Sequence, residues 1–355
     1  MQAAIFSFSA RGARLAAQVG EYLTSIGYDV DIQTVAKYAE QAGQKPMLPD
    51  HNAACGECFG RCQTIVFVGA AGIAVRTIAP FIKSKLTDPA VISVDERGSF
   101  IIPLLAGHIG GANEISRCLA AALGGTCCVT TATDVNGLFA VDEWAARNHM
   151  VLTSLKAAKD FAAALVDGQQ AALYYDAAFK VAGELPRQVV VSDAPAVGMA
   201  ITLDKTLAPF ASTVCLLPKI VHLGIGCRRN TPLEKIEALV LPELEKLKLD
   251  KRCIVALASV DLKKDEQGLL AFAKKYRLAA NFYTADELNA VEGEFTPSAF
   301  VKSVVGVSNV CERSAVLDSK GGRLLLRKTS CDGVTLAVAA ENLTLDFSRT
   351  GLKTD

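Results

Sequence analysis

The chain has no excess of charge, no long apolar run and few histidines. Its 355 residues include 37 basic and 37 acidic side chains, and this balance excludes the concentrated basic surface that nucleic-acid binding requires. No apolar run approaches the roughly 20 residues of a membrane span. The segment after Met1 has no basic residues ahead of its apolar ones, so we expect no signal peptide and a cytoplasmic protein. Nucleic acid and membrane are therefore not expected partners.

Cysteine, in contrast, is plentiful. Eleven cysteines in a chain without an export signal predict reduced thiols. The densest group is His51, Cys55, Cys58 and Cys62, whose soft ligand atoms could hold zinc or an iron–sulfur cluster. The three cysteines also share one apolar helix face with Phe59, which is ordinary core packing. We favour packing and predict no metal site, and the alternative is a metal or redox switch.

A chain of 355 residues is too long for one hydrophobic core, so several domains are expected. Short apolar segments alternate with helical patterns at the start, which is typical of an open, mostly parallel sheet flanked by helices. Two further α/β parts are predicted after it. The division is an N-terminal α/β domain over 1–137, a small middle α/β region over 138–218, a C-terminal α/β domain over 219–345 and a tail over 346–355.

The N-terminal domain is organised around one strand and the turn that follows it. Phe100–Leu105 is an apolar run that is long enough for a buried strand and too short for a helix. It leads into the sequence GHIGGAN over 107–113, after which Ala112–Leu123 has helical spacing. Backbone N–H groups and the helix dipole at such a turn favour anions. His108 lies on the turn and can act as base or proton shuttle, because imidazole titrates near neutral pH.

A second glycine turn lies earlier in this domain. Gly69 and Gly72 follow an apolar strand and precede a helix, and small residues there let the backbone approach a ligand. Arg76 lies one turn inside that helix. The same glycines could instead only shape a tight turn between strand and helix.

Two adjacent carboxylates, Asp95 and Glu96, end another predicted strand. Such pairs usually cap a turn or face water. Here the chain returns directly into the strand that leads to His108, so either carboxylate could orient the histidine or serve as the base itself.

The C-terminal part has a glycine turn of its own, in the sequence GIGCRRNTP. Thr231 is predicted to cap the helix that follows, with Pro232 as the first helical residue and Glu234 completing a capping box. The distinctive segments of this part are GIGCRRNTP over 224–232, SVDLKKDE over 259–266 and VSNVCERSA over 307–315.

Two motif sets in this order resemble one family. The chain is similar to cobalt-precorrin-5A hydrolase, an enzyme of anaerobic cobalamin (vitamin B12) biosynthesis. The segments that carry the resemblance are GHIGGAN, VFVGAAGIAVRTIAP over 66–80 and the three C-terminal segments. The resemblance covers almost the full chain, and its C-terminal part is also similar to a small separate protein of the aerobic pathway. Asn230 and Asn309 depart from the family, which usually has glycine and serine there.

The resemblance implies a cobalt-bound, ring-contracted tetrapyrrole substrate that carries a δ-lactone. Hydrolysis opens the lactone and releases acetaldehyde, giving cobalt-precorrin-5B. The cobalt arrives in the substrate, so no cofactor is expected. Neighbouring pathway enzymes and a second copy of the chain are further candidate partners. The alternative is a non-catalytic protein that binds or hands over a corrinoid intermediate of the same pathway.

Such a reaction needs an activated water, donors for the oxyanion and cations for the substrate's carboxylates. The predicted catalytic residues are His108, Asp95 and Glu96. Each arginine taken alone could equally be a solvated surface residue. The predicted substrate-binding residues are Gly69, Gly72, Arg76, Gly107, Gly110, Gly111, Asn113, Gly226, Arg228, Arg229, Glu312 and Lys328.

Overall fold

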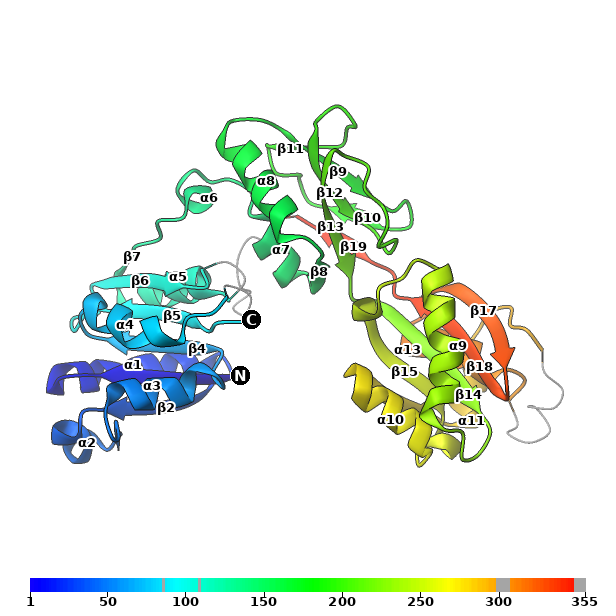
Figure 1. The fold of residues 1–355 in the computed structure, drawn as a ribbon, viewed down its shortest axis with the longest axis horizontal. Helices are drawn as coiled ribbons and strands as arrows, with labels where there is room; N and C mark the ends of the chain where they lie inside the picture. The colour runs from blue at the N-terminus through cyan, green and yellow to red at the C-terminus, as the bar shows by residue number, and fades with distance from the viewer. Residues whose placement is uncertain (85–86, 108–109, 298–306, 348–355) are drawn as a thin grey trace. The chain divides into compact units, whose positions relative to one another are not determined.

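The structure is a computed structural model that confirms the predicted multidomain α/β class (Figure 1). The residues that it describes are 1–84, 87–107, 110–297 and 307–347. They form two compact units, one over Met1–Glu143 and one that starts at Trp144. Within the described residues, no helix combines the length and the apolar composition that crossing a membrane requires.

The first unit is built on an open seven-stranded sheet with the order β3-β2-β1-β4-β5-β6-β7. Its strands are β1 (Gln2–Ser7), β2 (Asp29–Thr34), β3 (Lys45–Pro46), β4 (Thr64–Val68), β5 (Ala90–Val94), β6 (Phe100–Leu105) and β7 (Thr126–Cys127). Neighbouring strands are parallel except β5 and β6. The predicted strand over 100–105 is confirmed.

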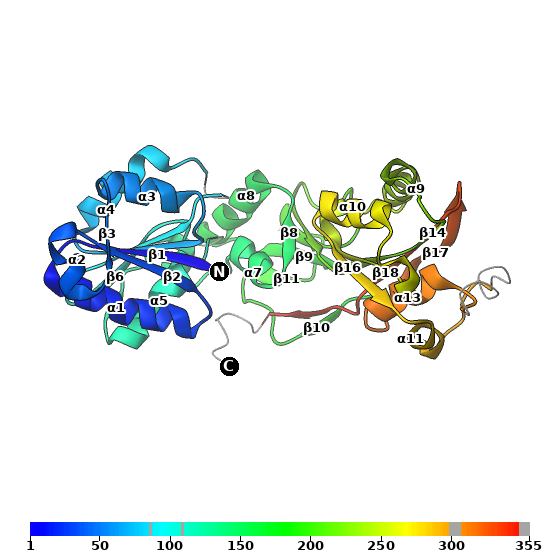
Figure 2. The ribbon, with the colours of Figure 1, turned by 90° about the horizontal axis from the view of Figure 1, so that it is seen from below.

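Helices cover both faces of this sheet (Figure 2). The helices of the unit are α1 (Ala10–Ser25), α2 (Ala36–Ala42), α3 (His51–Phe59), α4 (Ala71–Ile78), α5 (Ala112–Leu123), α6 (Ala132–Val135) and the start of α7 (Val141–Arg147), with a 3-10 turn at Ala79–Phe81. Apolar residues of α1 and α5 form one core, and those of α3 and α4 form a second core on the opposite face. Ser9 caps α1 by accepting the N–H of Gly12 at 3.0 Å.

The order of the strands reverses between β1 and β4. The chain moves from β1 to β2 in one direction, and β4, β5 and β6 follow in the other. The carboxyl ends of β1 and β4 therefore form the topological switch point, where open α/β sheets bind their ligands.

The second unit contains two five-stranded sheets. The strands of the first are β8 (Met150–Leu152), β9 (Ala171–Tyr175), β11 (Val189–Val190), β12 (Val197–Ile201) and β13 (Ser212–Pro218), in the order β11-β9-β12-β13-β8, with α8 (Leu155–Val166) packed on them. The strands of the second are β14 (Val221–Cys227), β15 (Ile254–Val260), β16 (Ala279–Tyr283), β17 (Arg323–Cys331) and β18 (Val334–Ala340), in the order β16-β15-β14-β18-β17.

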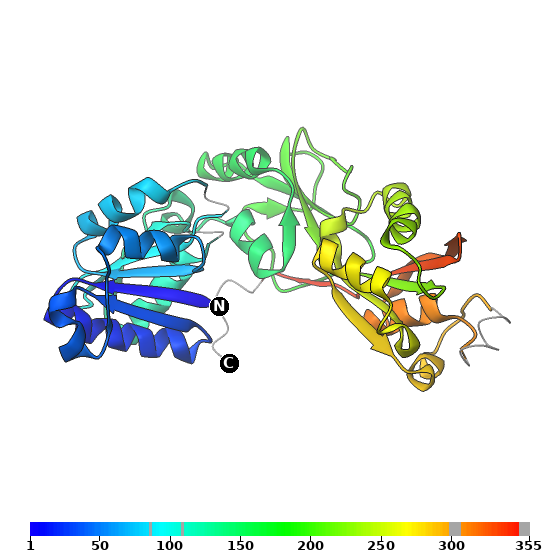
Figure 3. The same cartoon turned by 60° about the horizontal axis from the view of Figure 1, so that its bottom comes forward.

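Helices lie on both faces of the second sheet (Figure 3). They are α9 (Leu233–Lys246), α10 (Gln267–Tyr276), α11 (Ala285–Ala290) and α13 (Val310–Asp318), with 3-10 turns at Lys251–Cys253 and Asp261–Lys263. The cap predicted at Thr231 is wrong, because α9 begins after Pro232 and no side chain caps it. The Thr231 hydroxyl instead donates to the carbonyl oxygen of Arg228 at 2.8 Å.

The end of the described chain returns to the middle of the sequence. β19 (Thr344–Asp346) pairs in parallel with β10 (Lys180–Ala182). The ring of Phe347 stacks on Trp144 with the centroids 4.7 Å apart, and the Trp144 indole N–H donates to the carbonyl oxygen of Asp346 at 3.2 Å. The tail predicted over 346–355 thus begins inside a strand.

Candidate functional site

The predicted Gly69–Gly72 turn lies at the switch point, between β4 and α4. A Cβ on Gly69 would lie 3.2 Å from the ring of Phe8, which follows β1, so the loops after the two central strands are in contact. A Cβ on Gly72 would lie 3.5 Å from the guanidinium of Arg76. Arg76 therefore folds back over the turn and adds a positive charge to this edge of the sheet.

Asp95 and Glu96 lie at the same edge, after β5. Asp95 accepts hydrogen bonds from the N–H groups of Phe100 at 2.6 Å and Arg97 at 3.1 Å. Its carboxylate therefore caps the turn between β5 and β6. Glu96 accepts a hydrogen bond from the hydroxyl of Ser9.

The structure separates these carboxylates from the GHIGGAN turn. β6 runs antiparallel to β5, with Val94 opposite Ile101 and Val91 opposite Leu105. A strand rises about 3.3 Å per residue, so the five steps from Phe100 to Leu105 put about 16 Å between the two ends of β6. Asp95 therefore cannot contact Gly107, and the prediction that the two carboxylates act with the GHIGGAN turn in one site is wrong. His108, the predicted base, lies outside the described residues.

Asn113 holds the GHIGGAN turn together. Its side chain is 2% exposed, and its amide donates to Thr131 Oγ1 at 3.1 Å and to Asp134 Oδ2 at 2.9 Å. Its Oδ1 lies only 2.7 Å from where a Cβ on Gly107 would stand. These contacts make Asn113 a structural part of the turn.

The other glycines of this turn are required by its geometry. A Cβ on Gly110 would lie 2.5 Å from Cβ of Ala106 and 2.8 Å from its carbonyl oxygen, closer than atoms can approach. Gly111 has φ 82°, in the left-handed region, and precedes the first turn of α5. The turn can therefore bring backbone N–H groups to a ligand at the positive end of the α5 dipole.

An ion pair beside this turn was not predicted. Asp134 accepts hydrogen bonds from Thr131 and Asn113 and forms an ion pair with Arg117, which also contacts Glu114 at 3.3 Å. Burial lowers the pKa of Arg117, but the contact with Asp134 outweighs this and raises it. Because β6 and β7 are parallel, the segments after them meet at one edge, and this pairing could have pointed to Asp134.

In the second unit, Gly226 lies near the end of β14, and Arg228 comes directly after this strand. A Cβ on Gly226 would lie 2.6 Å from Thr335 Oγ1. The side chain of Arg228 lies against Gly333, and the backbone N–H of Arg228 donates to the carbonyl oxygen of Gly333 at 3.2 Å. Arg229 is exposed and pairs with Asp265 at 2.7 Å.

Glu312 has a structural role. Its side chain is 0% exposed, and its carboxylate accepts hydrogen bonds from the N–H of Lys328 at 2.6 Å and from the N–H and hydroxyl of Thr296 at 2.8 and 2.7 Å. Burial raises the pKa of Glu312, but these hydrogen bonds outweigh it and lower the pKa. We therefore correct the predicted substrate contact: Glu312 joins α13 to β17, and Lys328 meets it through its backbone.

A buried histidine in the same sheet also escaped prediction. His222 is 4% exposed, and its ring nitrogens contact Asp318 at 2.5 Å and Glu341 at 3.0 Å. Asp318 also accepts from Asn281 at 2.6 Å and Tyr283 at 2.7 Å. Burial raises the pKa of Asp318, but the hydrogen bonds, led by that from His222, outweigh it and lower the pKa. The sequence signal that could have pointed to His222 is a polar residue inside an otherwise apolar strand.

The predicted packing of the cysteine-rich segment is confirmed. Cys55, Cys58 and Cys62 are buried in the core between α3, α4 and the sheet. Among the described residues, no three His, Cys, Asp or Glu side chains are grouped so as to hold a metal ion.

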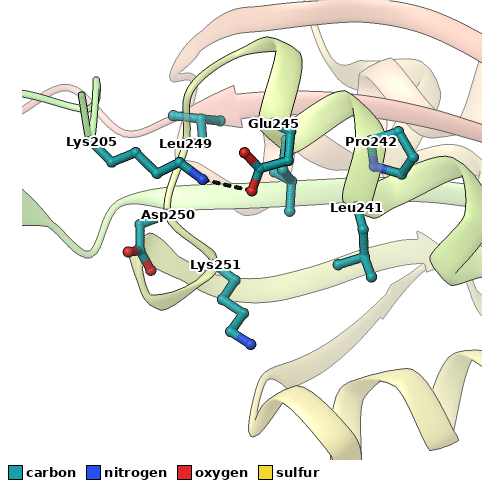
Figure 4. Close-up of a pocket in the computed structure, with 8 residues that line it drawn as sticks. Lys205, Leu241, Pro242, Glu245, Leu249, Asp250 and Lys251 are labelled. Atoms are coloured by element: carbon teal, nitrogen blue, oxygen red, sulfur yellow. Dashed lines mark hydrogen bonds and ion pairs between the residues drawn. The ribbon is translucent and has the colours of Figure 1, made fainter. Parts of the chain in front are cut away.

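A cavity of about 490 Å³ in the second unit lies apart from all the predicted site residues (Figure 4). Lys205 crosses its mouth to pair with Glu245 at 2.6 Å. Its lining residues are Lys205, Leu241, Pro242, Leu244, Glu245, Leu249, Asp250 and Lys251.

An open sheet with glycine turns at its strand ends, followed by two smaller α/β sheets, defines a multidomain α/β protein. Sequence models of three families match it in order: cobalamin synthesis G N-terminal over 53–134, cobalamin biosynthesis central region over 139–218 and cobalamin synthesis G C-terminus over 221–339. A cobalt-precorrin-5A hydrolase of Salmonella typhimurium is 37% identical over 79% of this chain and 83% of the relative. The chain belongs to the cobalt-precorrin-5A hydrolase family.

The chain is also similar to other proteins. A cobalt-precorrin-5A hydrolase of Priestia megaterium is 32% identical over 79% of both chains. Protein CobE of Sinorhizobium is 30% identical over 33% of this chain and 77% of its own. Among solved structures, a putative cobalamin biosynthesis protein G homolog from Sulfolobus solfataricus covers 96% of this chain and 97% of its own, with 24% identity and a TM-score of 0.41.

Proposed function

We propose that the protein hydrolyses the δ-lactone of cobalt-precorrin-5A in the cytoplasm, releasing acetaldehyde and giving cobalt-precorrin-5B in anaerobic cobalamin biosynthesis. The observation that carries the proposal is the 37% identity to a cobalt-precorrin-5A hydrolase of which this chain covers 83%. The cobalt belongs to the substrate, and the protein contributes no cofactor. Neighbouring pathway enzymes and a second copy of the chain remain candidate partners.

The proposed location of the chemistry is the GHIGGAN turn. His108 is the proposed base that activates water, and the N–H groups of Gly110 and Gly111 are the proposed donors to the oxyanion that forms on the lactone. The support for this assignment is the set of contacts by which Asn113 and Asp134 fix the turn at the start of α5. A preorganised donor pair acts on charge as it develops, without rearranging first.

The competing location for the same reaction is the switch point, where Glu96 would act as the base. The switch point lies at the other end of β6 from the GHIGGAN turn, at least about 16 Å away by the length of that strand, so one lactone cannot use both. The proposed cations for the substrate's carboxylates are Arg76 at this edge and Arg228, Arg229 and Lys328 in the second unit.

The test is anaerobic incubation with cobalt-precorrin-5A, with acetaldehyde and the mass of the corrinoid as readouts. We expect turnover by wild type, a loss of about 10²- to 10⁴-fold in His108→Ala with binding retained, and near-normal turnover in Glu96→Gln. The opposite pattern in the two variants would move the chemistry to the switch point. Binding without acetaldehyde in wild type would favour the corrinoid-binding and handover function instead.

A further inference from the structure

The cysteines at the end of α3 differ sharply in their surroundings. Cys55 and Cys58 lie one turn apart, and both are 0% exposed. Burial, with the nearby Cys58, raises the pKa of the Cys55 thiol to about 12. Cys58, in contrast, accepts hydrogen bonds from Arg61 Nη2 at 3.4 Å and from Gln33 Nε2 at 4.0 Å.

Arg61 is held over Cys58 by the neighbouring strand. Asp31 on β2 accepts from Arg61 at 2.9 Å and from Gln33 at 3.0 Å. Asp31 and Gln33 are two residues apart on one strand, so their side chains share a face of the sheet. The carboxylate therefore fixes both of the donors that point at the sulfur of Cys58.

Cys62 completes the arrangement. Interaction with the Cys62 thiol and the charge of Arg61 lower the pKa of Cys58 to about 7. The same interaction, together with burial, raises the pKa of Cys62. One sulfur thus carries the thiolate and its neighbour keeps the proton, which is the division of roles found in dithiols that react with disulfides.

The backbone allows the two sulfurs to bond. The N–H of Cys62 donates to the carbonyl oxygen of Cys58 at 2.9 Å, so the pair is spaced as one helical turn. Cβ atoms at this spacing lie about 5–6 Å apart, and a disulfide needs roughly 3.5–4.5 Å. α3 ends at Phe59, so Cys62 lies beyond the last turn of the helix, and a disulfide needs its Cβ to move about 1–2 Å toward Cys58.

We propose that Cys58 and Cys62 form a redox-sensitive pair that a small disulfide, such as glutathione disulfide, oxidises to an intrachain disulfide. The Cys58 thiolate attacks one sulfur of the oxidant, forms a mixed disulfide and releases one glutathione thiolate. Cys62 then loses its proton to that thiolate, attacks the sulfur of Cys58 and expels the second glutathione. Two protein thiols are oxidised and one disulfide is reduced to two thiols. Cys58 is 0% exposed, so the oxidant reaches its sulfur only when the side chain of Arg61, which is 46% exposed, moves aside.

The first test needs no substrate of the enzyme. The full chain is incubated with glutathione disulfide, and its thiols are counted after denaturation. We expect the count to fall by two from eleven. Trypsin cuts after Arg61, so we also expect two peptides joined through Cys58 and Cys62. In Cys62→Ser, which keeps a hydrogen-bond donor without a second sulfur, the glutathione adduct should remain on Cys58.

The second test isolates the arginine. Arg61→Gln removes the charge beside Cys58, and we expect oxidation at pH 7 to slow about three- to tenfold as the thiolate fraction falls. Lys45→Gln is the matched control, because Lys45 also pairs with Asp31, at 2.8 Å, and oxidation should keep its rate. Ultraviolet absorbance should show a thiolate titrating near pH 7 in wild type and none in Cys58→Ser. A full thiol count after oxidation, a disulfide between other cysteines, or equal titrations would overturn the proposal.

Discussion

Gly107, Gly110 and Gly111 show how single residues set the shape of the candidate site. Gly107 leaves room for the amide of Asn113, and Gly110 leaves room for Ala106. The repeated glycines are therefore explained by close approach and backbone angle within the turn, before any ligand is considered. Their pattern pointed to a ligand-binding turn, but the sequence could not reveal that a buried asparagine and an aspartate twenty-one residues further on support it.

Replacing Gly110 with alanine tests this account. The added methyl group would overlap Cβ and the carbonyl oxygen of Ala106, so we expect the free energy of unfolding of the first unit to fall by about 1–3 kcal/mol. Denaturant unfolding followed by circular dichroism measures it. The control is Gly60→Ala, where the new methyl meets no atom within 4 Å and a change within about 0.5 kcal/mol is expected. Equal losses in both variants would contradict the crowding at Gly110.

At the scale of elements, local sequence patterns predicted the strands and helices whose formation depends on local interactions. The apolar run of β6 and the helical spacing of α5 gave both elements with their bounds. The cap predicted at Thr231 is wrong because the Thr231 hydroxyl donates to a nearby carbonyl oxygen. β17 was not predicted, because burial alternates only weakly along this strand.

The relation between elements was harder to predict. A glycine at position 98 is typical of a tight turn, after which β6 runs back along β5. Which residues meet at the site depends on the direction of β6 along its whole length. A reversed strand carries its far end to the opposite edge of the sheet. This is why Asp95 and the GHIGGAN turn are neighbours in sequence and distant in space.

The buried network around His222 links four segments of the second sheet, and its stability should depend on pH. The folded-state pKa of Asp318 is lowered, so its carboxylate contributes stability above its unfolded pKa of about 3.9 and loses it as the pH falls through the folded value. At pH 7 we expect Asp318→Asn to lower the free energy of unfolding by about 3–5 kcal/mol, because a buried partner of His222 loses its charge.

Fluorescence of Trp144, the single tryptophan, reports unfolding of the second unit. The difference between wild type and Asp318→Asn should stay constant from pH 7 to about pH 4 and shrink at lower pH. Asp286→Asn is a control on the exposed first turn of α11, where no loss is expected. A difference that grew on acidification would have the wrong sign for this network.

At the scale of the whole chain, three matched family segments follow one another, yet the last described strand goes back to the middle of the sequence. β19 pairs with β10, which lies more than 160 residues earlier in the sequence, and no local sequence pattern could predict this contact. The segment predicted as a tail therefore contributes to the core of the second unit, since Phe347 is 3% exposed and lies against Trp144.

Phe347→Ala measures how much this return of the chain contributes. Removing a buried ring leaves a cavity and ends the stacking on Trp144, so we expect a loss of about 3–5 kcal/mol in the second unit and a shift in Trp144 fluorescence. Phe100→Ala is the control, because that ring is 53% exposed and lies in the first unit. It should leave Trp144 fluorescence unchanged. If Phe347→Ala matched this control, the β10–β19 pair would add nothing to stability, and the residues from 346 onward would serve as a tail, as first predicted.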